Sequence, residues 1–152
     1  MRRSEKEIKS LKEIEEVIQK AAVCHLGLAD GNEAYIVPLN FGYKDRALYF
    51  HSAGEGRKID LIKKNGKVSF EMETDFEVIS AETTCEWGAK FRSVMGTGKA
   101  RILEAEAEKL DGLKIITGHY GNKKFSVPKA NLDRVTIIKI DIEEMTGKKS
   151  RV

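Results

Sequence analysis

The sequence predicts a mainly β protein with flanking helices, built around an antiparallel barrel of six strands that is closed or partly closed. Six runs are rich in β-branched and aromatic residues or alternate in polarity, whereas only three segments have helical features. The first three β runs are joined by loops of a few residues, which is the usual length for hairpins. The length of 152 residues fits a single domain, 1–152.

The predicted helices cover residues 5–21, 54–65 and 105–120. In the first, apolar residues recur at helical intervals, and Ser4 and Glu7 have the spacing of a capping box. The strands are expected at 24–29, 34–43, 47–52, 67–79, 91–104 and 135–142, followed by a C-terminal tail at 143–152. Asp30-Gly31 predicts a tight turn. Pro38 predicts an edge, a bulge or a break in its strand, and Gly96 with Gly98 predicts a bulge or a close backbone approach.

Composition and charge exclude several classes of function. The 27 basic and 24 acidic residues are interleaved and leave a net charge of +3, so a nucleic-acid surface is not expected. The longest uncharged stretch, 34–43, is far shorter than the roughly 20 residues that span a bilayer, and no apolar leader follows the N-terminus. Neither the two cysteines nor the histidines have the spacing of a metal site. We therefore expect a cytoplasmic protein without membrane, nucleic-acid or metal binding.

The segment YFHSAGEGRK at 49–58 has the composition of an anion-binding turn. A strand ends in small polar residues and passes two glycines into a helix, whose first backbone amides and dipole favour a negative charge. Ser52 can donate a hydrogen bond, Arg57 can bind two oxygens at once and Lys58 adds a positive charge. These residues would hold a terminal phosphate, and the alternative is an ordinary solvated helix start. The chain lacks both GxxxxGK[ST] and GxGxxG.

The segment VPLNFGY at 37–43 and the residues around Trp87 are two further candidates. A strand interrupted at Pro38 leaves backbone groups free to pair with a planar heterocycle, and Asn40 offers both a donor and an acceptor. An edge strand at a barrel seam is the equal alternative. Trp87, followed by Arg92 and Ser93, could cover an aromatic ligand or fill a subunit interface. His51 is the only histidine next to the candidate anion site, and a histidine at a strand end more often packs or forms hydrogen bonds than acts in catalysis.

Taken in order, these segments resemble the FMN-binding split-barrel family related to pyridoxamine 5′-phosphate oxidase. Within that family the sequence is similar to the Nim-type 5-nitroimidazole resistance (nitroreductase-like) proteins. The likeness begins near residues 1–3 and continues through the stretches CHLGLADGNEAYIVPLNFGY, LYFHSAGEGRKIDLIKKNGKVSFEME, FRSVMGTGKARI, EKLDGL, HYGNKKF and IIKIDIEEMTGKK. The chain is shorter than pyridoxamine 5′-phosphate oxidase itself and lacks its arginine- and histidine-rich substrate segments, so vitamin B6 oxidation is not expected.

The resemblance implies a split barrel that forms a homodimer with two FMN molecules at the subunit interface. It places the strand with Pro38, Leu39 and Asn40 along the isoalloxazine ring, and His51, Ser52 and Ala53 at the ribityl chain and phosphate. It further implies that Arg57 and Lys58 bind this phosphate. Residues matching Trp87, Arg92, Ser93 and Lys148 would come from the second copy. A functional histidine is also implied near the flavin, and His51 is the candidate for this catalytic role.

The expected function is that of an FMN-dependent oxidoreductase. The flavin would take electrons from a reduced nicotinamide or another donor and pass them to a small planar acceptor such as a nitroaromatic compound or a quinone. Two alternatives stay open. The first is a flavin-binding protein without turnover, used for storage, sensing or electron transfer. The second is a related barrel that holds heme or a deazaflavin, although an anchor for a single phosphate slightly favours FMN.

Overall fold

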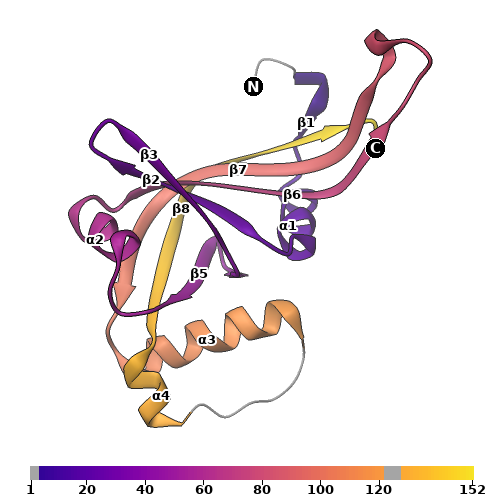
Figure 1. The fold of residues 1–152 in the computed structure, drawn as a ribbon. Coiled ribbons are helices and arrows are strands. Elements are labelled where there is room, and N and C mark those ends of the chain that lie inside the picture. Colours follow the sequence, from indigo (N-terminus) through magenta and orange to yellow (C-terminus); the bar gives the residue numbers. More distant parts are fainter. Residues whose placement is uncertain (1–3, 122–127) are drawn as a thin grey trace.

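The computed structural model describes residues 4–121 and 128–152, so residues 1–3 and part of the HYGNKKF stretch lie outside the described residues. All described strands belong to one antiparallel sheet with the order β3-β2-β6-β7-β8-β5-β4, and β1 pairs with the far end of β8 (Figure 1). The strands are β1 (Glu7–Ile8), β2 (Cys24–Asp30), β3 (Glu33–Leu39), β4 (Gly42–Lys44), β5 (Ala47–Ser52), β6 (Lys67–Ile79), β7 (Gly88–Leu103) and β8 (Thr136–Ser150). The edge strands β3 and β4 do not pair with each other, so the barrel is split between them.

The helices are α1 (Leu11–Lys20), α2 (Arg57–Lys64), α3 (Glu106–Tyr120) and α4 (Lys129–Arg134). Single 3-10 turns lie at Ser4–Lys6 and Thr84–Glu86. The predicted fold class, a mainly β antiparallel split barrel with flanking helices, is confirmed. The described strands number eight rather than six, because the run 34–43 divides after Leu39 and because Glu7–Ile8 forms an additional short strand.

Two boundaries at the ends of the chain differ from the prediction. The first helix begins at Leu11 rather than residue 5, and its cap is Ser10, whose hydroxyl accepts a hydrogen bond from the Glu13 amide at 3.4 Å. Ile8 is withdrawn from the helix because it pairs with Gly147 and is buried in the core. The segment 143–152 is not a free tail, since β8 continues to Ser150 and pairs with β7 from Ile137 to Ser150. Helix α4 was not predicted.

The core fills the barrel interior with side chains from alternate strand positions. Fully buried members of this core include Leu26, Phe41, Leu48, Phe50, Met72, Val94, Ile138 and Ile140. Helix α1 adds Ile14, Val17 and Ile18 to the same cluster, and α2 adds its three apolar residues. A second, smaller cluster joins α3 to β7 and β8 through Leu103, Ile116 and Ile137.

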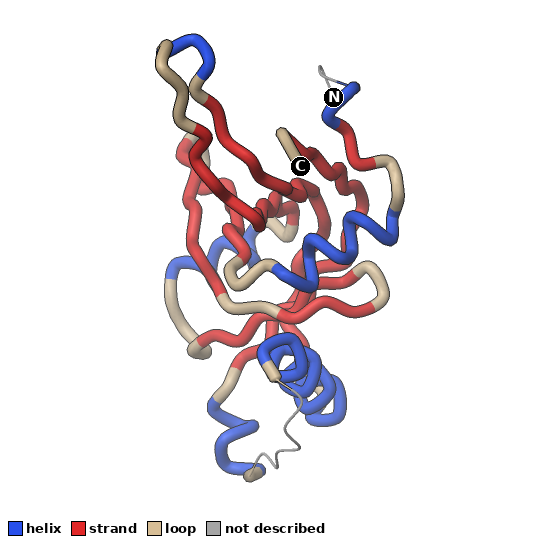
Figure 2. The backbone as a smooth tube through the Cα atoms, turned by 90° about the vertical axis from the view of Figure 1, so that its right-hand side faces the viewer, coloured by secondary structure: helices blue, strands red, loops and turns tan. Residues whose placement is uncertain are grey.

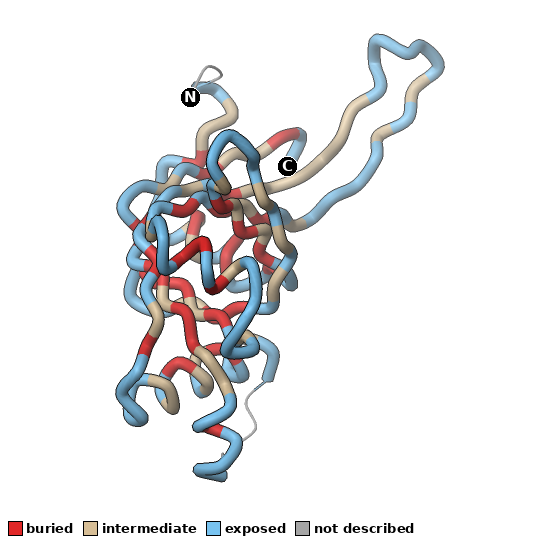
Figure 3. Tube along the Cα trace, turned by 60° about the vertical axis from the view of Figure 1, so that its left-hand side comes forward, coloured by how far each residue is buried: buried red, intermediate tan, exposed pale blue. Residues whose placement is uncertain are grey.

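Strands β6 and β7 continue beyond the barrel as a hairpin, and Figure 2 shows it projecting from the body of the molecule. We call residues 75–91 the arm. Figure 3 shows that buried positions gather in the barrel while the arm is exposed or half-buried. An ion pair between Arg92 and Asp75 at 2.7 Å closes its base, and the Trp87 indole N–H donates to the Ala81 carbonyl at 2.7 Å. These two polar contacts join the strands at the base of the arm and link Trp87 to the opposite side of its turn.

The predictions for Pro38, Gly96 and Gly98 are confirmed. Pro38 lies in β3, at an edge of the sheet. The pairing of β7 with β8 shifts register between Thr97 and Gly98, and a Cβ on Gly98 would lie 2.5 Å from the Asp141 carbonyl oxygen. A Cβ on Gly96 would overlap both the β8 backbone and the Phe70 ring. Both glycines are needed for close backbone approach.

Candidate functional site

The predicted anion site lies where α2 begins, after the chain leaves β5. Gly56 is the N-cap residue with a φ of 127°, a conformation that glycine adopts far more readily than other residues. No side chain caps the helix within the described residues, so its first backbone amides lack side-chain acceptors. The Asp60 amide makes the first intrahelical bond, to the Gly56 carbonyl at 3.1 Å. The start of α2 therefore combines backbone N–H groups that have no side-chain acceptor with the positive end of the helix dipole.

Lys58 is half-buried in the first turn of α2, and burial lowers the pKa of its ammonium group below the ordinary value. The direction of this shift means that the charged form lacks full compensation for the water it has lost. A bound anion at the same helix start would supply that compensation. Lys58 therefore lies in the first turn of α2, as the sequence predicted, and its role in anion binding stays a prediction.

Arg57 also lies at the start of α2, but its guanidinium group already has acidic partners that the sequence did not indicate. Its Nε and Nη2 donate to Asp30 at 3.0 and 2.8 Å, and Nη2 also donates to Glu33 at 3.3 Å. The group stacks over the Tyr35 ring at 4.6 Å. The hydrogen bond to Asp30 and the neighbouring carboxylates raise the pKa of Arg57. Its Nη1 makes no hydrogen bond to the described residues, so one edge remains available to a ligand.

The other predicted residues of this set lie at or just after the ends of β3 and β5. Pro38 and Asn40 are exposed, whereas the Leu39 side chain is half-buried and packs on the core. His51 and Ser52 are the last residues of β5 and lie opposite Ile137 and Thr136 of β8. Ala53 follows them and is exposed. The His51 side chain is exposed and makes no hydrogen bond to the described part of the chain, so its catalytic role stays a prediction.

The second predicted set lies in another part of the molecule. Ser93 and Lys148 are directly opposite each other on β7 and β8, Arg92 is the next residue on β7, and Trp87 lies on the arm. Figure 1 shows the arm projecting away from α2 and the end of β5. Ser93 and Lys148 therefore share one face of the sheet, and Arg92 points to the other, where it pairs with Asp75. A single chain does not bring these residues to Arg57.

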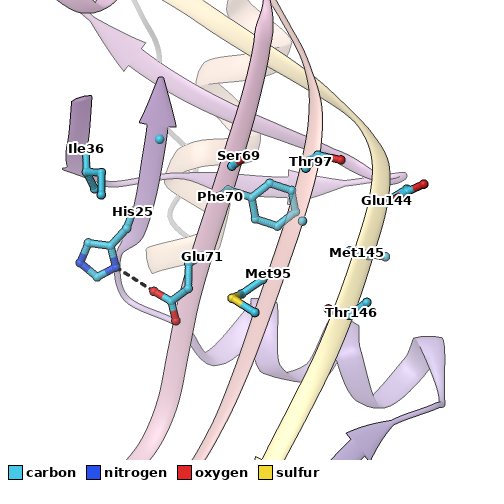
Figure 4. A pocket seen from close by; sticks show the side chains of 12 residues that line it. His25, Ile36, Ser69, Phe70, Glu71, Met95, Thr97, Glu144, Met145 and Thr146 are labelled. Atoms are coloured by element: carbon cyan, nitrogen blue, oxygen red, sulfur yellow. Dashed lines mark hydrogen bonds and ion pairs between the residues drawn. The ribbon is translucent and has the colours of Figure 1, made fainter. Parts of the chain in front are cut away.

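A groove of about 630 Å³ lies on the outer face of the sheet, where sequence reasoning placed no site. Figure 4 shows its lining, in which the His25 Nδ1 atom lies 3.1 Å from Glu71 Oε2. Ile36 and Met95 are 65% and 50% exposed and contribute apolar surface. The groove is lined by His25, Gly27, Ile36, Ser69, Phe70, Glu71, Met95, Gly96, Thr97, Glu144, Met145 and Thr146. His25 is half-buried, and its ring is paired with the Glu71 carboxylate.

The sequence signal that could have indicated this groove is the alternation of side chains between the two faces of a strand. His25 and Gly27 on β2, and Ser69 and Glu71 on β6, point to the same face in the observed register. That register joins positions 46 residues apart, and the sequence does not specify it. The groove could therefore be recognised only once the pairing of β2 with β6 was known.

Comparison with known proteins decides the family. A family model described as pyridoxamine 5′-phosphate oxidase matches residues 10–149. The chain belongs to this family. Among solved structures, a proposed 5-nitroimidazole antibiotic resistance protein from Bacteroides thetaiotaomicron is 32% identical, with a TM-score of 0.85, over 94% of this chain and 86% of the other. No curated protein matches the chain significantly.

Two more distant members of the structural neighbourhood share the fold alone. The FAD and heme binding protein from Mycobacterium smegmatis superposes with a TM-score of 0.87 at 14% identity, over 97% of this chain and 74% of that one. The flavocytochrome Anf3 from Azotobacter vinelandii gives a TM-score of 0.85 at 16% identity, over 100% and 72%. Among the described residues of the present family member, no helix is long and apolar enough to cross a membrane.

Proposed function

We propose that this protein binds FMN and acts as an oxidoreductase that passes electrons from a reduced nicotinamide or another donor to a small planar acceptor. The observation that carries the proposal is the start of α2, which has backbone amides without a side-chain cap and two adjacent cationic residues, Arg57 and Lys58, the first with an Nη1 that has no partner among the described residues. Membership of the pyridoxamine 5′-phosphate oxidase family supports it. The Mycobacterium smegmatis neighbour binds FAD, and the Azotobacter neighbour is a flavocytochrome, which also favours a flavin.

The phosphate of FMN would match this donor set in chemical type. A phosphate monoester offers three acceptor oxygens and close to two negative charges, which would suit several backbone N–H donors, the Lys58 ammonium group and the Nη1 donor that Arg57 has left beside Asp30 and Glu33. Arg57 would donate from Nη1 while Asp30 keeps the guanidinium group in place, and Ser52 would add a hydroxyl donor. A single terminal phosphate suits one helix start, and this favours FMN over a dinucleotide flavin.

The flavin ring would lie along β3 at the split of the barrel. This strand pairs only with β2 among the described strands, so its other edge offers backbone N–H and C=O groups that no strand occupies. A planar heterocycle with several polar edge atoms could pair with these groups near Pro38, Leu39 and Asn40. The bound flavin would supply the redox chemistry, while these residues would orient it and keep one face accessible.

Sites of this kind would be completed by a second copy of the chain, which makes a homodimer part of the proposal. The arm carries three large apolar side chains that are 63%, 57% and 53% exposed: Phe76, Val78 and Trp87. An ordered hairpin with this much apolar surface fits an interface between copies. Such an interface would place Trp87 of the arm near the flavin of the other chain, together with Arg92, Ser93 and Lys148.

A nitroaromatic compound is the first acceptor to test, because the Bacteroides structure with 32% identity is a proposed 5-nitroimidazole antibiotic resistance protein. His51, exposed at the end of β5, is the candidate to donate or accept a proton beside the ring. FMN-loaded protein should oxidise NADH or NADPH with a nitroimidazole or a quinone as acceptor. Full flavin loading without turnover on broad donor and acceptor panels would leave a flavin carrier instead.

The phosphate anchor is tested by comparing FMN with riboflavin, which has the same ring and no phosphate. Arg57→Ala should weaken FMN binding by about 10- to 150-fold, the loss expected for one charge-assisted contact, and should leave riboflavin affinity unchanged. Lys58→Ala should act in the same direction. Lys63→Ala is the matched control, because Lys63 lies in the last turn of the same helix. Equal losses for both ligands, or no loss of FMN, would place the phosphate elsewhere.

A further inference from the structure

The last turn of α3 contacts the segment between β3 and β4 through two aromatic side chains. The Tyr120 hydroxyl accepts a hydrogen bond from the Phe41 backbone N–H at 3.1 Å and donates to the Ala22 carbonyl at 2.8 Å. The His119 ring packs on Phe41 with a centroid distance of 4.3 Å, and its Nε2 lies 2.7 Å from the Ala21 carbonyl oxygen. Helix α3 thus joins two loops that lie about 20 residues apart in sequence.

One of these contacts bears directly on Asn40. The Phe41 N–H and the Asn40 C=O belong to the same planar peptide unit and point in opposite directions when the bond is trans. Because the Tyr120 hydroxyl binds the N–H, it also sets the direction of the Asn40 carbonyl, which points away from Tyr120. Phe41 is fully buried, so this peptide has no freedom to turn at its other end.

We propose that Tyr120 is a positioning residue for the ligand ring: its hydroxyl fixes the Asn40–Phe41 peptide and thereby the Asn40 backbone carbonyl, which directly follows β3 at the split. This inference rests on the proposed flavin site along Pro38 to Asn40. Tyr120 does not contact the ring itself in this account. It acts through the Phe41 amide, and the residue is half exposed, at 47%, so its role does not depend on filling the core.

The second hydrogen bond of Tyr120, to the Ala22 carbonyl, fixes the direction in which its hydroxyl proton points. A hydroxyl that donates to the Ala22 carbonyl keeps its lone pairs for an incoming donor, and the buried Phe41 N–H is that donor. Phenylalanine at position 120 would keep the ring and remove both bonds. The Phe41 amide would then lose its only partner among the described residues, and the Asn40 peptide would sample other orientations.

The test uses Tyr120→Phe with Thr117→Val as the matched control. Thr117 lies one turn earlier in α3, and its hydroxyl bonds only to carbonyls of its own helix, those of Leu113 and Lys114. Each variant is titrated with FMN and with riboflavin, and exchange of the Phe41 amide with deuterium is followed by NMR in the flavin-free protein. Urea unfolding of each variant records global stability separately.

Tyr120→Phe should speed Phe41 exchange by about 2- to 12-fold, as expected for one lost hydrogen bond, and should weaken both flavins by the same factor. Equal loss distinguishes ring positioning from the phosphate anchor, which discriminates between the two ligands. Faster exchange with unchanged flavin affinities would overturn the positioning role and leave a structural contact. Unchanged exchange would overturn the contact itself. Wild-type protein that binds neither flavin would refute the proposed function and, with it, the positioning role.

Discussion

Gly42, the first residue of β4, lies in direct contact with the backbone of α3. A methyl group added at this position would push α3 and β4 apart. An ideal Cβ at this position would lie 2.6 Å from the carbonyl carbon and oxygen of Ile115 and 2.7 Å from the amide nitrogen of Ile116. Ordinary contacts of a Cβ are 3.4–4 Å, and the atoms in the way are backbone atoms that cannot rotate aside. Gly42→Ala therefore requires α3 or β4 to move by roughly 1 Å.

The destabilisation caused by Gly42→Ala can be estimated from the packing of α3 against β4. Overfilling a packed contact costs about 1–3 kcal/mol, and a clash between backbone atoms belongs at the upper end of that range. We expect a loss of about 3 kcal/mol in the free energy of unfolding, equivalent to a fall of about 6–12 °C in Tm for a domain of this size. Gly118 provides a control of opposite sign, because a Cβ there meets nothing within 4 Å. Gly118→Ala should gain about 1 kcal/mol through helix propensity.

Both variants are measured by thermal and urea unfolding followed by circular dichroism, at one fixed flavin concentration because bound ligand raises Tm. The expected order of Tm is Gly118→Ala, wild type, Gly42→Ala. A Gly42→Ala protein as stable as the wild type would refute the backbone contact between α3 and β4. It would also remove support for the hydrogen bond between the Tyr120 hydroxyl and the Phe41 amide, because that bond depends on the position of α3.

Three further predictions concern pH, thiols and assembly. Burial and the hydrogen bond to Glu15 raise the pKa of Tyr43 from 10.0 to about 12. The contact should therefore stabilise the fold below pH 10, and this stabilisation should be lost as the pH rises toward 12. Tyr43→Phe should flatten the curve of unfolding free energy against pH in that range. Native protein should react with a thiol reagent at exposed Cys85 only, because Cys24 is buried and burial raises its pKa to about 12. Rapid reaction of two thiols per chain would contradict the burial of Cys24. Replacing Phe76 with serine should weaken dimerisation by at least about tenfold in sedimentation experiments, and unchanged association would exclude the arm from the interface.

Features that depend on neighbours in sequence were predictable. The turn at Asp30-Gly31, the edge position of Pro38 and the start of the second helix near Arg57 all follow from local backbone chemistry. The six main strands were located for the same reason. The residue types of the anion site were also evident, because a helix start with adjacent cations is a local pattern.

Features that depend on distant pairing were not predictable. Ser4 with Glu7 and Ser10 with Glu13 have the same capping spacing, and what selects Ser10 is the burial of Ile8 against β8, some 140 residues away in sequence. The residues 143–152 resemble a polar tail because their partners lie on β7 and β1.

The same limit explains what was missed at the candidate sites. The link from Arg57 to Asp30 and Glu33 depends on how the β2–β3 hairpin meets α2, and the pair His25 and Glu71 depends on the register between β2 and β6. Neither contact joins residues that are close in sequence. The chemistry of individual side chains was therefore available from the sequence, but their partners came from the fold.

The visible absorption spectrum of the purified protein is the most direct test of FMN binding by this family member. Heat-released cofactor is identified by mass in the same sample. The account predicts flavin bands and the release of FMN, with uptake of added FMN by any flavin-free fraction. A colourless protein that fails to bind added FMN would contradict the account, because the donors at the start of α2 would then serve no flavin phosphate.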